Sequence, residues 1–215
     1  MTDPLHQPGD YGTDIYTEAD ASDDTLANLG PLRTLAGTWH GTAGQDVSPK
    51  APGPDISGFS ETWTFDACDS QVNGPQLFYG LRYHHHVLKD GEAPTFHDQV
   101  GYLMWEPHEQ RIWMTLAIPR VQVAIAVGQA APDAREFTLR AEAGSPDSGI
   151  VSNPWLDENF RTSSWEITFK ILDDDRWTYA QDTTLHIPGQ ASPFAHRDSG
   201  TLQRTGAAQP NPLLG

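Results

Sequence analysis

Short runs of alternating apolar and polar residues recur along the chain from about residue 37 onward. In the clearest run, 59–65, three aromatic residues and Glu61 fall on one side, and three Ser or Thr residues fall on the other. A period of two is typical of β-strands that bury one face. Ten runs of this kind are expected as strands, at 37–41, 59–65, 76–88, 96–106, 111–118, 121–128, 137–142, 163–172, 176–187 and 201–204. With no long helical pattern between them, they predict an all-β fold, an antiparallel up-and-down β-barrel of about ten strands.

The start of the series predicts how one end of this barrel is closed. Leucines at 26, 29, 32 and 35 recur with a helical period, and Pro31 interrupts it, so we expect a short broken helix that covers this end. Trp39, between Gly37 and Gly41, is expected to plug the same end. A guanidinium stacked on the indole would complete the plug, and Arg204 in the last strand is the candidate. The first and last strands are then neighbours.

Two stretches are expected to be loops. Residues 42–58 are rich in Gly and Pro. The long, turn-rich segment 144–161 contains Trp155 and Phe160, which predict that it folds over something apolar. The expected hairpin turns are Lys89-Asp90-Gly91 and residues 173–175.

Composition and charge narrow the functional classes. The net charge of −16 opposes binding to nucleic acid and to anionic membranes. Cys68 is the single cysteine, so the chain forms no internal disulfide and no cysteine-based zinc site, and a reducing compartment is expected. The N-terminus lacks the features of a signal peptide or membrane span. We therefore predict a cytoplasmic protein with a flexible acidic arm over 1–24, a barrel domain over 25–205 and a disordered tail over 206–215.

The nine histidines are the most informative candidates for chemistry. In the run 84–86, His84 and His86 share one strand face and could share a metal ion, although a solvent-facing strand is the simpler interpretation. His97 is either a core histidine or a cavity group. His196 lies in the apolar context Pro193-Phe194-Ala195, just before the last strand, and a single neutral imidazole in such a context can serve as an axial ligand of haem iron. Nothing in the sequence indicates a hydrolase, because it lacks the nucleophile elbow and the phosphate-binding glycine loop.

Several of these stretches together resemble the nitrobindin family, haem-binding relatives of the calycin or fatty-acid-binding barrels. Gly37-Thr38-Trp39-His40-Gly41 is similar to the family's opening Gly-x-Trp-x-Gly motif. Residues 60–65 and the run 93–103, which contains His97-Asp98-Gln99-Val100-Gly101-Tyr102, continue the resemblance. The stretch 193–204 is similar to the C-terminal region that carries the family's haem-ligating histidine.

The resemblance implies a barrel that holds ferric haem b, with His196 as the iron ligand and with His97 and Trp63 at the cofactor. It also implies nitric oxide binding and the isomerisation of peroxynitrite to nitrate, with no catalytic side chain from the protein. The interval from His196 to Leu202 is one residue longer than the family pattern. An inward-facing His196 therefore requires a bulge, expected at Ser199–Gly200.

Two alternatives remain open from the sequence. One is a haem-free carrier of an apolar small molecule, similar to lipocalins or fatty-acid-binding proteins, in which His196 and His97 only form hydrogen bonds. The other is a metal-dependent barrel that uses His84 and His86. Each has a small-molecule ligand inside the barrel, and a homodimer through an exposed barrel face is a further hypothesis.

Overall fold

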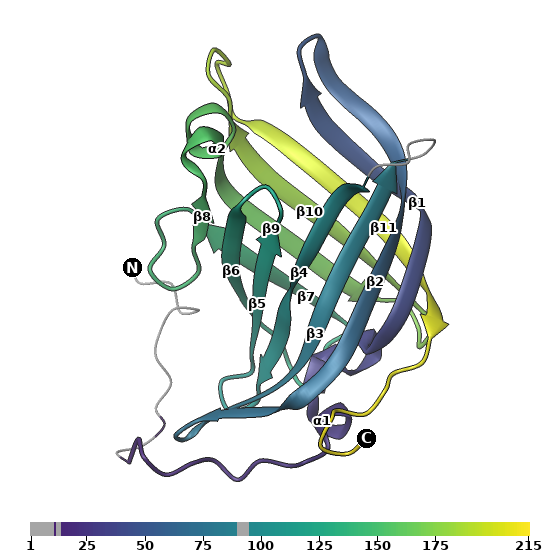
Figure 1. Ribbon diagram of the computed structural model, residues 1–215, viewed down its shortest axis with the longest axis vertical. Coiled ribbons are helices and arrows are strands. Elements are labelled where there is room, and N and C mark those ends of the chain that lie inside the picture. The colour runs from purple at the N-terminus through teal and green to yellow at the C-terminus, as the bar shows by residue number, and fades with distance from the viewer. Residues whose placement is uncertain (1–10, 12–13, 90–94) are drawn as a thin grey trace.

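The computed structural model describes residues 11, 14–89 and 95–215 of the chain. Its strands form one antiparallel sheet that closes into a ten-stranded barrel, as the sequence predicts (Figure 1). The strands are β1 (Gly37–Lys50), β2 (Gly53–Asn73), β3 (Gln76–Lys89), β4 (Thr95–Glu106), β5 (Arg111–Ile118), β6 (Gln122–Gln129), β7 (Glu136–Glu142), β8 (Ile150–Ser152), β9 (Arg161–Ile171), β10 (Arg176–His186) and β11 (Phe194–Gly206).

The ring follows the chain closely. Each strand from β1 to β6 pairs with the next, and the ring is completed through β7, β9, β10 and β11, which returns to β1. The short strand β8 stands outside this ring. It pairs with residues 122–124 of β6, whereas β7 pairs with β6 only through Val127 and Arg140. The insertion therefore supplies an extra strand where β6 and β7 have separated.

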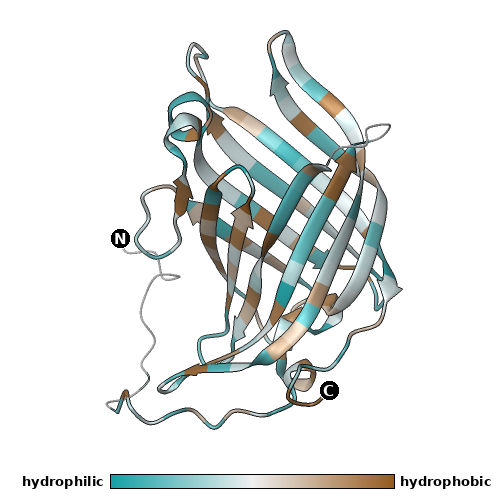
Figure 2. Ribbon diagram, viewed as in Figure 1, coloured by the Kyte–Doolittle hydropathy of each residue, from teal (hydrophilic) through white to brown (hydrophobic). Residues whose placement is uncertain are grey.

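Buried and exposed residues alternate along the strands, so that one face of each strand lines the inside of the barrel and the other faces out. In β7 the buried residues are Phe137, Leu139 and Ala141, and the residues between them are exposed. Figure 2 shows the corresponding alternation of apolar and polar bands along the strands. The inward side chains form one continuous core, which the leucines beside α1 (Thr25–Asn28) cover at one end of the barrel.

That end is closed as the sequence predicts. The guanidinium of Arg204 lies 4.0 Å from the ring centre of Trp39, which is fully buried. Arg204 also donates hydrogen bonds to the carbonyl oxygens of Ala36 and Thr34, so it ties β11 to the segment that precedes β1. The broken helix is α1 followed by a 3₁₀ helix, η2 (Gly30–Leu35). Its buried leucines cover the aromatic core.

The prediction of a loop over 42–58 is wrong. Strand β1 continues to Lys50, β2 begins at Gly53, and the two pair along this whole length apart from an irregularity between Gly41 and Gly44. The prolines are tolerated because Pro49 faces Pro54 beyond Val47, the last residue of β1 that pairs with β11. A proline at such an edge breaks no ladder on its free side. The β1–β2 hairpin consequently projects past the neighbouring strands (Figure 1).

The last strand is longer than the predicted 201–204, and the expected bulge at Ser199–Gly200 is absent from its pairing with β10. That register runs unbroken from Phe194 to Gln203. The pairing of β11 with β1 is irregular instead, between Thr38 and Trp39 and again between His40 and Gln45, where β1 carries an extra residue. His196 therefore falls on the same inward face as Leu202.

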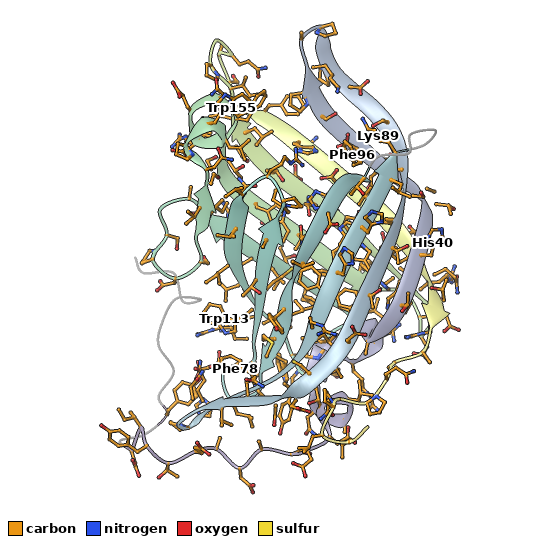
Figure 3. The ribbon with its side chains drawn as sticks, in the orientation of Figure 1. His40, Phe78, Lys89, Phe96, Trp113 and Trp155 are labelled. Carbon is orange, nitrogen blue, oxygen red and sulfur yellow. The ribbon has the colours of Figure 1, made fainter. Side chains whose placement is uncertain are left out.

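The insertion 144–161 holds β8 and the short helix α2 (Pro154–Asn159). Asn153 caps this helix by accepting a hydrogen bond from the amide of Leu156. Figure 3 shows Trp155 of α2 at the end of the barrel opposite α1, the same end as Phe96 and Lys89. This is the open end.

The flanking segments contact the closed end. The amide of Ala19 donates to the carbonyl oxygen of Gly74. In the C-terminal segment, where the sequence predicts a disordered tail, Asn211 is fully buried and donates to Asp69 and to the carbonyl oxygen of Asp23. Part of the predicted arm (1–10, 12 and 13) and part of the predicted turn (90 and 91) lie outside the described residues. No helix in the described part of the chain has the length and apolar character needed to span a membrane.

Candidate functional site

The open end of the barrel contains a cavity of about 420 Å³, a volume typical of pockets for small ligands and cofactors. Apolar side chains from most of the strands and from α2 line it, and the exposed residues Trp155 and Phe160 lie at its rim. Three histidines also line it: His85 from β3, His97 from β4 and His196 from β11. These histidines fall into two clusters with opposite electrostatic character.

The first cluster joins β1 and β11. Asp46 lies directly opposite Asp198 in the register of these two strands, and His196 is two residues from Asp198 on the same face. Nε2 of His196 lies 2.8 Å from Oδ1 of Asp46 and 3.6 Å from Oδ1 of Asp198. Burial opposes protonation of the imidazole. Hydrogen bonds and charge from Asp198 and Asp46 outweigh that effect and raise the pKa of His196 to about 9. At neutral pH the ring is an imidazolium.

Both carboxylates are held by neutral donors outside the cluster. Ser57 Oγ donates to Oδ2 of Asp46 at 3.4 Å, and Nε2 of Gln181 donates to Oδ2 of Asp198 at 2.9 Å. These contacts leave Oδ1 of each carboxylate directed at His196. Burial of Asp46 favours its neutral form and is the largest single influence, but the hydrogen bonds from His196 and its other partners, together with the charge of His196, outweigh it and hold the pKa of Asp46 below its usual value.

The second cluster lies deeper and is built around Glu61. Oε2 of this carboxylate accepts hydrogen bonds from Trp63 Nε1 (2.9 Å) and Tyr179 OH (2.9 Å), and it lies 2.8 Å from Nε2 of His85. Burial raises the pKa of Glu61 to about 7, although these donors lower it. A Cβ atom on Gly200 would overlap Oε1 of Glu61, so the glycine is what gives the carboxylate its space.

The two histidines of this deeper region are neutral. Burial holds the pKa of His85 well below its usual value and lowers that of His97 to about 4. Their ring centres are 5.6 Å apart. Nε2 of His97 lies 3.3 Å from Oε1 of Gln99, whose amide in turn donates to the hydroxyl of Tyr83. The cavity therefore contains two neutral imidazoles and one cationic imidazole.

The structure brings His196 and His97 to one cavity but places Trp63 behind its wall. Trp63 is buried, and its ring stacks on that of His85 at 3.8 Å between centres, so it supports a lining residue. His84 and His86 point to the outside, where Nε2 of His84 contacts Asp98 and Nε2 of His86 contacts Thr95. Among the described residues, these two histidines belong to no cluster of three or more potential metal ligands.

Sequence reasoning missed four polar residues of the site, and the signals differ. Asp198 could have been found, because it lies two residues after His196 and so shares its face. His85 and Glu61 could also have been found, because the alternation of their strands places both side chains on the inward face of the barrel. Asp46 gave no signal, because its segment was interpreted as a loop and its partner is 150 residues away.

Comparison with known proteins gives a family from one source and a fold from another. No curated protein matches the chain. The crystal structure of Rv2717c from M. tuberculosis is similar, with 22% sequence identity, a TM-score of 0.58, and coverage of 84% of this chain and 97% of that one. At this identity the likeness shows the fold alone. The model of the family described as "THAP4-like, heme-binding beta-barrel domain" matches residues 28–204. In agreement with the resemblance to nitrobindin, the chain belongs to the THAP4-like, haem-binding β-barrel domain family.

Proposed function

We propose that the protein binds haem b in the cavity at the open end of the barrel, with His196 as the iron ligand. The observation that carries this proposal is that the unbroken register of β11 turns His196 into an apolar-walled cavity in a chain that belongs to a haem-binding family. The open mouth gives a route of entry for a large flat ligand.

The mostly apolar walls of the cavity suit such a group, whereas ligation by His196 depends on the protonation state of its imidazole. An iron ligand must offer a ring-nitrogen lone pair, and Nε2 of His196 now carries a proton that is shared with Asp46. Ligation therefore requires Nε2 to lose this proton and to exchange its contact with Asp46 for a bond to iron. Haem affinity should rise with pH for this reason.

The remaining residues would determine what reaches the iron. A bound ferric haem would supply an open coordination position for a small ligand such as nitric oxide or peroxynitrite. His97 and His85, neutral and held by Gln99 and Glu61, would present uncharged imidazoles to that ligand. Nitric oxide binding and peroxynitrite isomerisation are the activities we propose for this arrangement, and the acidic surface with the free thiol of Cys68 is consistent with a cytoplasmic location.

Haem titration tests the proposal. Haem is added to the wild type, His196→Ala, His97→Ala and a matched control, His40→Ala, whose side chain is exposed on the outside of the barrel (Figure 3). We expect a Soret band in the wild type, the control and His97→Ala, and loss of that band in His196→Ala. Loss of the band only in His97→Ala would overturn the assignment of the ligand.

A haem-free carrier is the second candidate, and one observation favours it. His196 already contacts two carboxylates, and this cluster could orient a polar group of an apolar ligand without any metal. Absence of a Soret band in the wild type, together with displacement of a fluorescent fatty-acid probe from the cavity, would support the carrier.

A further inference from the structure

We propose that Asp46, His196 and Asp198 form a site for a single divalent first-row transition-metal ion on the wall of the cavity. One ligand atom from each residue, a carboxylate oxygen or an imidazole nitrogen, lies within 4.8 Å of the other two. Three side chains on two paired strands thus present their donors to one point. This site differs from a haem site, because the protein side chains would bind the bare ion without a porphyrin.

Charge favours a cation at this point. Asp46 and Asp198 are direct cross-strand neighbours, an arrangement in which two carboxylates repel each other. A divalent cation bound between the two carboxylates would neutralise them at a largely buried position, where Asp46 is fully buried.

The surroundings already hold the ligands in place. Ser57 and Gln181 each bind the oxygen that does not face His196, which is the role that supporting hydrogen bonds have around metal ligands. Ser48 lies two residues after Asp46 on β1, and it favours the ionised form of that carboxylate. Its hydroxyl oxygen is buried and has no well-oriented hydrogen-bond partner in the described part of the chain. It is available to a further ligand of the ion, such as a water molecule.

The donor set narrows the class of ion. One imidazole and two carboxylates suit Zn²⁺, Fe²⁺, Co²⁺ or Mn²⁺ and do not suit Cu(I), which prefers sulfur. Three protein ligands leave at least one coordination position open. Because His196 and Asp198 line the cavity, that position faces the space in which a small ligand would bind.

The proposed metal site shares one nitrogen with the proposed haem function but does not depend on it. Nε2 of His196 can serve only one metal at a time, so Co²⁺ and haem should compete. The carboxylates separate the two proposals, since Asp46 and Asp198 are ligands for the bare ion but are not ligands for haem iron.

Cobalt titration tests the site directly. Co²⁺ is added to the full chain, and its visible absorption is followed in the wild type, Asp46→Asn, Asp198→Asn, His196→Ala and a control, Asp182→Asn. Asp182 is an exposed β10 carboxylate that pairs with Arg197. We expect the wild type and the control to bind one ion with tetrahedral or five-coordinate absorption. Each of the three site variants should lose at least about tenfold in affinity. Far-UV circular dichroism checks that every variant retains its sheet.

Haem titrations of the same proteins distinguish the outcomes. Cobalt binding without a Soret band would support the metal site and reject the haem proposal. A Soret band that persists in Asp198→Asn while cobalt binding is lost would support both proposals. Equal cobalt affinity in the wild type and Asp198→Asn, or no binding by the wild type at millimolar Co²⁺, would overturn the metal site.

Discussion

The two ends of the barrel are made by the same strands and differ in what the inward positions carry. At the closed end the inward rings of Trp39, Trp63 and Trp177 touch edge to face, with centres 5.6–6.1 Å apart. At the open end the same face of β1 and β11 carries Asp46, His196 and Asp198 around a cavity. Along the same inward face, large rings fill the closed end, whereas smaller polar side chains leave a cavity at the open end. A substitution at one end should therefore have little effect on the packing of the other.

The protonation states follow the same division. Around the deeper histidines burial is the largest influence on the pKa, neighbouring imidazoles lower it further, and the rings are neutral. Around His196 two carboxylates dominate, and the ring is cationic. Histidines that line one cavity therefore differ in charge because their neighbours differ, although all three are largely buried.

The largest expected effect is at the closed end. Trp39→Ala should lower the free energy of unfolding by about 3–5 kcal/mol, since it removes a fully buried aromatic ring and the partner of Arg204. Urea denaturation measures the change. Trp155→Ala, at an exposed tryptophan of the open end, is the matched control and should change stability by less than about 0.5 kcal/mol. Similar losses in both variants would contradict the division between the ends.

The closed end was also the more predictable from sequence. The strand periods and the broken helix follow from local patterns, because apolar burial leaves a period in the chain. The pair Trp39–Arg204 is distant in sequence, but it follows once the first and last strands are taken as neighbours in a closed barrel. The open end depends on pairings across long sequence distances. The contact of Asp46 with His196 spans 150 residues and rests on an irregularity in β1 that no local pattern showed. Proline and glycine in 42–58 indicated a loop, although an edge hairpin tolerates both.

A second prediction concerns Glu61, which lies between the two ends. Its folded-state pKa is raised from 4.5 to about 7, so the folded protein binds more protons than the unfolded chain between these pH values. Its contribution to stability is therefore fully present below pH 4.5 and is lost as the pH rises through about 7. Relative to Glu61→Gln, the wild type should lose on the order of 3 kcal/mol over this window.

Urea unfolding of both proteins at a series of pH values measures this difference. The comparison with Glu61→Gln is needed because the buried neutral histidines act in the opposite direction, raising stability with pH up to their unfolded value of 6.5. A difference between wild type and variant that stays constant from pH 4 to pH 8 would show that Glu61 does not titrate in this range.

A third, smaller effect is expected at Gly200, whose lack of a side chain makes room for the Glu61 carboxylate. Gly200→Ala should cost about 1–3 kcal/mol, because the added methyl group overlaps Oε1 of Glu61 and the ring of Tyr179. The exposed neighbour Ser199→Ala is the control and should be close to neutral. If the two substitutions cost the same, the glycine is not what positions Glu61.

The smallest effect on stability and the clearest effect on access are expected from Trp155. Its indole is 61% exposed, lies at the rim of the cavity and leans on Phe160 with 5.9 Å between ring centres. Truncation to alanine removes little buried area but widens the entrance, so haem should associate severalfold faster while the unfolding midpoint stays unchanged.

A substitution is a sharper test than deletion of the insertion, because residues 150–152 pair with β6 and their loss would expose that strand. Stopped-flow measurement of the Soret change compares Trp155→Ala with Ile125→Ala, another partly exposed apolar residue that does not line the cavity. Equal association rates in these two variants and the wild type would mean that entry is limited elsewhere in the barrel and that α2 does not control access to the cavity.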